Sequence, residues 1–205
     1  MSIKMHNKPL KSCFNMLFIG DRKISANMLT MCFKDSVFQK TCSEFILIVT
    51  DNDEYWRREV CRLKYKMAHA IINNFSDECF LDLHTSASGG IKILLIIDKP
   101  LDGLYSDPIA RSIIANNKNY GISSVIMTDS ISTLPVETRG SIDYVLLLDF
   151  CNVSFDEYYD DYFSFRSKRS LKYLFDKYTG DNFSALFIDV KACDKERKIF
   201  SVSVL

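Results

Sequence analysis

Polar residues that follow short apolar runs are the part of this sequence best placed to do chemistry. They are the segment 20–27, Thr50, the pair Asp98 and Lys99, and the segment 128–130. If the apolar runs are parallel strands of one open sheet, these residues meet beyond its carboxyl edge, where such sheets bind ligands. The chemistry to consider there is phosphate binding by a glycine-containing loop and Mg²⁺ binding by a carboxylate.

Predicted strands and helices alternate along the chain. Apolar runs rich in β-branched residues predict strands at residues 14–19, 45–50, 91–97, 123–128, 144–148, 185–190 and 199–204. Apolar spacing and capping residues predict helices at 26–34, 55–73, 106–117 and 156–178. This order predicts a three-layer α/β fold whose central sheet is mostly parallel, with the last two strands as an antiparallel C-terminal edge.

The length and composition predict a single globular domain over residues 1–205, with residues 1–12 expected to be flexible. Lys plus Arg and Asp plus Glu both number 26, so no overall basic field indicates a nucleic-acid or membrane partner. The apolar runs are far shorter than the roughly 20 residues that span a bilayer. The polar N-terminal segment does not resemble a signal peptide, so we expect an intracellular protein without a membrane span.

Cysteine and histidine show no pattern of a metal site or a disulfide framework. The seven cysteines are scattered without a C-x-x-C pair, and the three histidines lack ligand spacing. Buried free thiols are the simpler interpretation, because disulfides are rare in reducing compartments. No Ser-His-Asp or Cys-His constellation can be singled out.

Five motifs in the second half of the chain resemble the genome-packaging ATPases of poxviruses and other large DNA viruses, a branch of the FtsK and HerA superfamily. In order they are the helix end and turn 116–123, Thr128-Asp129-Ser130, Leu134-Pro135, the Arg-Gly-Ser-Ile-Asp-Tyr segment 139–144, and the closing helix and strand at 174–179 and 187–190. The resemblance implies the fold of a P-loop NTPase. It also implies a viral protein acting in DNA packaging or virion assembly.

The resemblance places a nucleotide-binding loop at Gly20, where a working P-loop reads G-x-x-x-x-G-K-[ST]. Counting from Gly20, the second Gly, the Lys and the Ser or Thr are replaced by Ser25, Ala26 and Asn27. Arg22 and Lys23 could swing toward a phosphate, but neither holds the position of the motif lysine. Gly20 could also be only a turn glycine. In both cases the sequence does not support tight binding of Mg-ATP.

The resemblance also assigns catalytic positions. Asp98 ends an apolar strand in the place of the Walker B carboxylate that holds Mg²⁺, whereas Lys99 stands where active members usually carry an acid. Asp129 takes the sensor position, where an ionised carboxylate would repel the nucleotide's γ-phosphate. Arg139 fits an arginine finger that would act on the nucleotide of a neighbouring subunit in a ring. As plain structural alternatives, Asp98 forms a turn and Arg139 is an exposed residue before a strand.

Three hypotheses on function remain open. In the leading one, the chain is a packaging-ATPase-like pseudoenzyme that acts by interaction, in the infected-cell cytoplasm or the virion. Its candidate partners are a homo- or hetero-oligomeric ring, viral DNA and a capsid protein. The second is an active ATP-driven, DNA-translocating packaging ATPase, which would need ATP and Mg²⁺ with Lys23 in place of the motif lysine. The third is a non-catalytic α/β scaffold.

Two further segments have both a structural and a functional interpretation. The aromatic and acidic run 155–165 predicts a helix with one buried face, or a surface for a protein partner. Lys168, Arg169 and Lys172 could contact DNA, although a short basic face is common on helices of soluble proteins.

Overall fold

The computed structural model describes residues 10–34, 45–51, 53–62, 68–73, 82–83, 85–86, 88–98, 108–148, 158–178, 184–193 and 199–203. Within these residues the strands are β1 (Asn15–Ile19), β2 (Phe45–Thr50), β3 (Ala68–Ile72), β4 (Ile93–Asp98), β5 (Ile122–Thr128), β6 (Tyr144–Leu147), β7 (Ser184–Asp189) and β8 (Ile199–Ser203). The α-helices are α1 (Arg22–Lys34), α2 (Asp53–Arg62), α4 (Pro108–Asn116), α5 (Val136–Ser141) and α7 (Lys168–Tyr178). Two 3-10 helices, η1 (Asn117–Tyr120) and η2 (Ile131–Thr133), and a π-helix, η3 (Tyr159–Phe163), complete the described elements.

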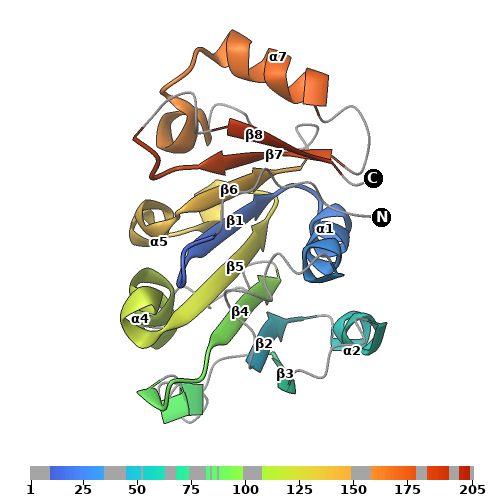
Figure 1. The fold of residues 1–205 in the computed structure, drawn as a ribbon, viewed down its shortest axis with the longest axis vertical. Coiled ribbons are helices and arrows are strands. Elements are labelled where there is room, and N and C mark those ends of the chain that lie inside the picture. Colours follow the sequence, from blue (N-terminus) through green and yellow to red (C-terminus); the bar gives the residue numbers. More distant parts are fainter. Residues whose placement is uncertain are drawn as a thin grey trace.

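All eight strands belong to one sheet, in the order β3-β2-β4-β5-β1-β6-β7-β8. The strands from β3 to β6 pair in parallel, whereas β7 is antiparallel to β6 and β8 is antiparallel to β7. This arrangement confirms the predicted α/β fold with a mostly parallel sheet and an antiparallel C-terminal edge. The first strand lies inside the sheet, and β5 separates it from β4 (Figure 1).

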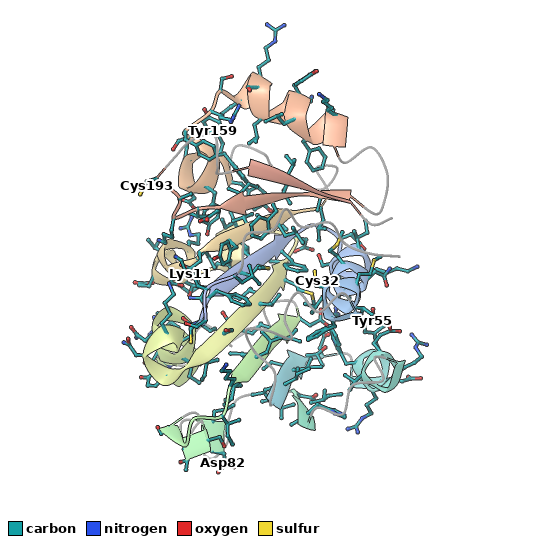
Figure 2. The ribbon with its side chains drawn as sticks, in the orientation of Figure 1. Lys11, Cys32, Tyr55, Asp82, Tyr159 and Cys193 are labelled. Atoms are coloured by element: carbon teal, nitrogen blue, oxygen red, sulfur yellow. The ribbon has the colours of Figure 1, made fainter. Side chains whose placement is uncertain are left out.

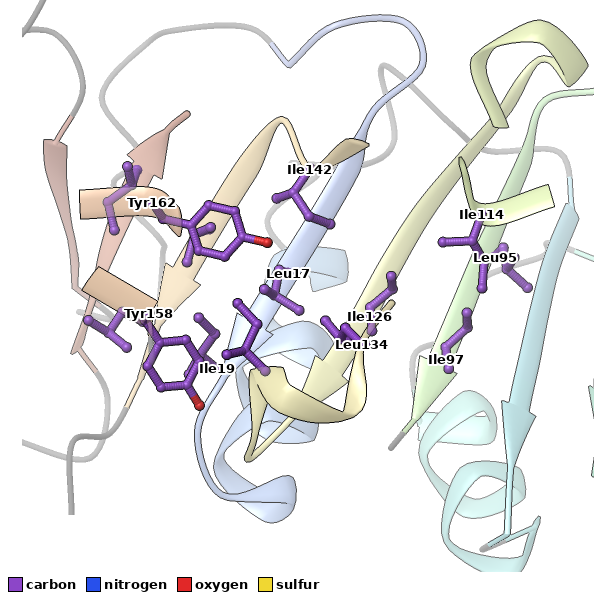
Figure 3. Close-up of a cluster of buried hydrophobic side chains, with 14 of the residues drawn as sticks. Leu17, Ile19, Leu95, Ile97, Ile114, Ile126, Leu134, Ile142, Tyr158 and Tyr162 are labelled. Atoms are coloured by element: carbon purple, nitrogen blue, oxygen red, sulfur yellow. The ribbon is translucent and has the colours of Figure 1, made fainter. Parts of the chain in front are cut away.

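Helices cover both faces of the sheet and enclose two hydrophobic cores (Figure 1). Side chains of β1 alternate between the two, as expected of a strand. On one face Met16 and Phe18 pack with apolar residues of α1 and with Trp56 of α2. On the other, Leu17 and Ile19 pack with apolar residues of α4, η3 and α7 (Figure 3). Because β1, β4 and β6 are buried on both faces, their sequences are nearly continuous apolar runs, and the equally buried β5 mixes apolar residues with Ser123, Ser124 and Thr128.

The helix predicted over residues 55–73 is wrong in its second half. The structure ends α2 at Arg62 and then places Ala68–Ile72 as strand β3, paired in parallel with β2. The sequence Ala-His-Ala-Ile-Ile has few of the residues that favour strands. Within the described residues β3 pairs with a neighbour on one side only, so it need not be apolar along its whole length. Its conformation is therefore decided by pairing with β2 and not by residue propensity.

The single helix predicted over residues 156–178 is also wrong, because a turn interrupts the helical conformation between η3 and α7. The amide of Arg166 donates to the carbonyl of Phe163 at 3.0 Å, which closes a turn after η3. Ser167 then caps α7, since its Oγ accepts the amide of Ser170 at 3.2 Å. The apolar spacing continues through this break, so periodicity alone could not locate it.

Three cysteine side chains lie within the described residues and are free thiols, Cys13, Cys32 and Cys193, but only Cys32 is buried. No helix in the described ranges has the length and apolar character needed to cross a membrane.

Candidate functional site

The carboxyl ends of β1, β5, β4 and β2 lie next to one another, as predicted for the candidate site. In the strand register Ile19 faces Thr128, Asp98 faces Met127, and Thr50 faces Asp98. Gly20, Thr50, Asp98 and Asp129 therefore lie along the same edge of the sheet. We call the part of this edge between β1 and β2 the carboxyl-edge site.

Helix α1 begins directly after β1, without an extended loop. The amide of Gly20 donates to the carbonyl of Thr128 at 3.1 Å, and the φ angle of Gly20 is 154°, which glycine adopts far more readily than other residues. Asp21 Oδ1 then accepts the amides of Lys23 at 2.8 Å and of Ile24 at 3.2 Å. Asp21 is thus the N-cap of α1, and its carboxylate takes the amide groups that would otherwise attract an anion.

The residues aligned with the end of a P-loop lie inside α1, which begins at Arg22 and not near residue 26 as predicted. Ser25 and Ala26 are buried, and Ala26 packs in the core shared with β1. Asn27 and Lys23 are exposed. A lysine at position 26 would have to turn out of this core toward the space between α1 and α2 that Ala26 also borders. Because Asp21 would still cap α1, restoring the motif residues would not by itself restore a phosphate-binding loop.

Arg22 binds Asp98 across the end of β5. Arg22 Nε donates to Asp98 Oδ1 at 2.9 Å, and Arg22 Nη2 donates to Asp98 Oδ2 at 2.7 Å. The same Nη2 group contacts Thr50 Oγ1 at 3.2 Å and forms an ion pair with Asp51. This two-pronged geometry is the strongest arrangement of an arginine and a carboxylate.

Asp98 receives four hydrogen bonds in all. Besides the two from Arg22, Oδ2 accepts from Thr50 Oγ1 at 2.9 Å and from Trp56 Nε1 at 2.6 Å. A carboxylate offers about four lone-pair positions, so these donors use most of its capacity: three bonds fall on Oδ2 and one on Oδ1. We call Arg22, Asp98, Thr50 and Trp56 the arginine clasp.

Within the clasp, the cation that pairs with Asp98 is the protein's own Arg22. The Asp98 side chain is 1% exposed, so its charge needs a close partner. Burial acts to lower the pKa of Arg22, but hydrogen bonds and charge attraction from Asp98 and Asp51 outweigh it and raise the pKa further. The guanidinium is permanently charged and balances Asp98 at any ordinary pH. The residues present therefore do not fit Mg²⁺ at Asp98 while the clasp is closed.

A cleft of about 360 Å³ opens beside the clasp, between α1 and α2. Tyr55 lies at this place in Figure 2. The cleft is lined by Asp21, Arg22, Lys23, Ala26, Tyr55, Arg58 and Asp98. Its charges are mixed, three cations against two acids, and both acids are engaged as the N-cap and the clasp. The charges that line the cleft therefore do not select between an anionic and a cationic ligand.

The other predicted catalytic residues are spread over the edge and beyond it. Asp129 is exposed next to Gly20 and Arg22, where the three border a hollow of about 10 Å³. The backbone carbonyl of Asp129 accepts the hydroxyl of Tyr158 at 3.0 Å. Lys99 lies outside the described residues. Within the described ranges no group of three or more His, Cys, Asp or Glu side chains could hold a metal ion.

Arg139 on α5 is bound within its own chain. Its Nη1 donates to Asp161 Oδ2 of η3 at 2.8 Å, and its backbone carbonyl accepts the hydroxyl of Tyr162 at 3.1 Å. Burial raises the pKa of Tyr162, with a further contribution from the charge of Asp161. The predicted arginine finger is thus tied to η3, which the sequence could not indicate.

Replacing Tyr162 with phenylalanine is expected to lower the free energy of unfolding by about 1 kcal/mol, the usual contribution of one hydrogen bond. The aromatic ring would still fill its place in the core, so only the contact with the Arg139 carbonyl is lost. Urea unfolding measures the change. A loss of several kcal/mol would show that the hydroxyl does more than anchor η3 to α5.

Two of the motifs that carry the sequence resemblance, 116–123 and 139–144, meet at the opposite, amino edge of the sheet, whereas the Thr128-Asp129-Ser130 motif lies at the carboxyl edge. Lys118 Nζ donates to Asp143 Oδ1 at 2.8 Å, which joins the 116–123 and 139–144 motifs. Lys11 Nζ contacts the same oxygen at 3.2 Å, and the Asn15 amide donates to Oδ2 at 3.0 Å. Asn117 Nδ2 donates to the carbonyls at 14 and 122. These motif residues therefore stabilise the fold and do not line the carboxyl-edge site.

This network also corrects one boundary. Residues 1–12 were expected to be flexible, and residues 1–9 lie outside the described part of the chain. Leu10 is buried, and Lys11 is paired with Asp143 (Figure 2). Leu10 and Lys11 therefore belong to the described fold.

Sequence reasoning missed three members or neighbours of the clasp. Trp56 and Asp51 were not singled out, and Arg22 was considered only as a phosphate ligand. The available signal was the unpaired strand-end carboxylate of Asp98, which requires a donor nearby. The identity of that donor depends on the order of strands in the sheet, which the sequence does not predict.

Comparison with known proteins identifies the fold but no sequence family. No protein-family model matches the chain, and no curated protein matches it significantly. The genome-packaging NTPase B204 of Sulfolobus turreted icosahedral virus 2, solved with ATPγS, aligns with a TM-score of 0.60 and 12% identity over 95% of this chain and 98% of that chain. Its sulfate complex gives a TM-score of 0.64 and 13% identity, covering 94% and 96%.

The DNA-packaging ATPase B204 of Sulfolobus turreted icosahedral virus is similar as well. It aligns with a TM-score of 0.55 and 14% identity, over 94% of this chain and 98% of that chain. At such identities the likeness shows the P-loop NTPase-like fold alone.

Proposed function

We propose that this protein is a packaging-ATPase-like pseudoenzyme, which acts in viral genome packaging or virion assembly by interaction and not by hydrolysing ATP. The observation that carries the proposal is the arginine clasp, in which Arg22 and two other donors use most of the binding capacity of Asp98. The similarity in fold to genome-packaging NTPases supports the role in packaging or assembly.

The start of α1 supports the same proposal. A phosphate-binding loop needs free amide groups at a helix N-terminus and a lysine aimed at the phosphates. Here Asp21 already caps α1, and the aligned lysine position is the buried Ala26. An incoming phosphate would have to displace a like-charged carboxylate from these amides. ATP binding in the usual mode would therefore need α1 to unwind by a turn and the clasp to open.

An assembly role leaves the partner to be determined. A ring of identical or different subunits, viral DNA and a capsid protein are the candidates consistent with packaging. Arg139 could act on a neighbour's nucleotide only if its ion pair with Asp161 opened. We therefore expect no contribution of Arg139 to catalysis while η3 is in place.

Mg-ATP is expected to leave the thermal midpoint of the purified protein unchanged. A ligand at 100 times its dissociation constant stabilises a protein by about 2.7 kcal/mol, which would raise the midpoint of a domain of this size by roughly 5 to 10 °C. The measurement is a thermal melt with and without Mg-ATP, together with an assay for released phosphate. A raised midpoint with phosphate release would instead support the active packaging ATPase.

Two variants make this experiment sharper. Arg22→Met opens the clasp and leaves the Asp98 carboxylate available, so it tests whether Mg²⁺ binding is blocked by Arg22 alone. The triple change Ser25→Gly, Ala26→Lys and Asn27→Thr restores the motif letters only. We expect that triple variant to remain unable to bind ATP, because Asp21 would still cap α1 and Arg22 would still hold Asp98. Lys92→Ala, at an exposed position that precedes β4 and lies outside the carboxyl-edge site, is the matched control.

A further inference from the structure

Helices α4 and α5 lie next to each other on one face of the sheet, and a groove of about 290 Å³ runs between them (Figure 1). Its walls include Pro108, Arg111 and Ala115 of α4 and Pro135, Glu137 and Thr138 of α5. Val136, between two of these residues, is 68% exposed, more than any other large apolar side chain in the described ranges. We call these residues, with Val136, the α4–α5 face.

The two walls of the groove carry opposite charges that are not used within the described part of the chain. Arg111 on α4 and Glu137 on α5 are both exposed, and neither forms an ion pair or a hydrogen bond with another described side chain. Arg139, also on α5, is by contrast paired with Asp161 of η3. The residue that a ring would need at a neighbour's nucleotide is thus engaged in its own chain, whereas the α4–α5 face is open.

We propose that the α4–α5 face pairs with the same face of a second copy of this chain, in a dimer with two-fold symmetry. In such a dimer every contact occurs twice, so one face must supply both members of each contacting pair. The α4–α5 face does so for charge, because Arg111 of each copy would meet Glu137 of the other. It does so for shape as well, because the exposed Val136 of each copy can enter the groove of the other.

Other occupants fit this face less well. One cation and one acid balance each other, so the groove does not attract a polyanion such as DNA. A ring joins two different surfaces head to tail, and it would leave the self-complementary charges of the α4–α5 face without a purpose. Covering Val136 removes apolar area from water, whereas Arg111 and Glu137 remain compatible with water when the copies separate. We therefore expect a reversible dimer.

The test is the mass of the purified full-length protein in solution, measured by light scattering over a range of concentrations. A monomer should convert to a dimer as the concentration rises. Arg111→Glu and Glu137→Arg should each weaken the dimer roughly tenfold or more, because each places two pairs of like charges across the interface. Val136→Ser should weaken it too, and the exposure of Val136 means that the fold of the separate monomer is kept.

A mixture of the two charge-reversed proteins separates contact between copies from an effect inside one chain. Neither protein should dimerise with itself. In a mixed dimer, Arg111→Glu of one copy faces Glu137→Arg of the other, and the unchanged Glu137 faces the unchanged Arg111. Both contacts again join opposite charges, so the mixture should recover the dimer. Raising the salt concentration should weaken the dimer of the unchanged protein, because ions screen exposed charge pairs.

Lys172→Glu is the matched control, since it makes the same change of charge at an exposed position of α7, which packs beside β7 and β8. It should leave the dimer unchanged. Thermal midpoints measured in dilute solution check that all variants fold. The proposal is overturned if the unchanged protein stays monomeric at every concentration, if it assembles beyond two copies, or if mixing the two charge-reversed proteins restores no dimer. The result is independent of the carboxyl-edge site, because ATP binding is not part of the measurement.

Discussion

Replacing Arg22 with methionine is expected to lower the free energy of unfolding by about 3 kcal/mol. The change leaves the charge of Asp98, a side chain 1% exposed, without its cation. Removing one partner of a buried ion pair costs about 3 to 5 kcal/mol. The lower end applies, because Arg22 is itself 33% exposed and Thr50 and Trp56 still donate to Asp98. Urea unfolding followed by fluorescence measures it, since Trp56 is the only tryptophan.

A double-mutant cycle separates the clasp from simple loss of side-chain packing. Asp98→Asn should cost less than Arg22→Met, because an amide can be buried without a charge and Arg22 keeps Asp51. The double variant Arg22→Met with Asp98→Asn should be more stable than the sum of the two single losses predicts. If Arg22→Met changes stability by less than about 0.5 kcal/mol, the usual range for surface substitutions, the clasp has no structural role and its occupation of Asp98 loses significance.

Replacing Asp143 with alanine is expected to cost about 4 kcal/mol. Its buried carboxylate accepts from Lys118, Lys11 and the Asn15 amide, so the change leaves several donors without their acceptor. Lys118→Met should cost less, since Lys118 is 44% exposed and Lys11 still neutralises Asp143. Thermal or urea unfolding of the three proteins measures the order. Equal losses for Asp143→Ala and Lys118→Met would contradict a network centred on the carboxylate.

Acid should act through the same residue. Burial by itself raises the pKa of Asp143, but the hydrogen bonds from Lys118 and Asn15 and the charges of both lysines outweigh it and lower the pKa below 3.8. A depressed folded-state pKa means that the stabilisation is fully present above the unfolded value and is lost as pH falls below 3.8. The urea midpoint of Asp143→Asn should therefore depend less on pH than that of the unchanged protein in this acidic range. Identical acid dependence would show that the lysines do not stabilise the carboxylate.

The two polar networks lie at opposite edges of the sheet and have different consequences. At the amino edge, Lys118 and Asp143 belong to the motifs that resemble packaging ATPases and hold the fold together. At the carboxyl edge, Arg22 and Asp98 form an internal ion pair where the resemblance implies nucleotide and metal. The residues at the amino edge thus stabilise the sheet, whereas those at the carboxyl edge are the ones on which the proposed loss of catalysis rests.

The inner strands of the sheet could be predicted because a strand buried on both faces has a recognisable run of apolar residues in its sequence. Ile93–Asp98 and Ile122–Thr128 are buried along their whole length, so apart from Asp98 their residues are apolar or are small hydroxyl residues. Strand Ala68–Ile72, which pairs on one side only among the described residues, has no such continuous apolar run, and its sequence predicts a helix instead. The break between η3 and α7 was missed for a related reason, since the same apolar spacing serves both elements.

By itself the sequence determined that Ser25, Ala26 and Asn27 do not match the residues of a working P-loop counted from Gly20, and that a carboxylate ends the predicted strand before Lys99. It could not determine what neutralises that carboxylate. Arg22 and Asp98 are 76 positions apart, and they meet only because β1, β5 and β4 lie side by side with their carboxyl ends aligned. The strength of an ion pair depends on the distance between its charges and on how much water surrounds them. Both quantities are set by packing, and so only the tertiary structure decided that the site is closed by the protein's own arginine.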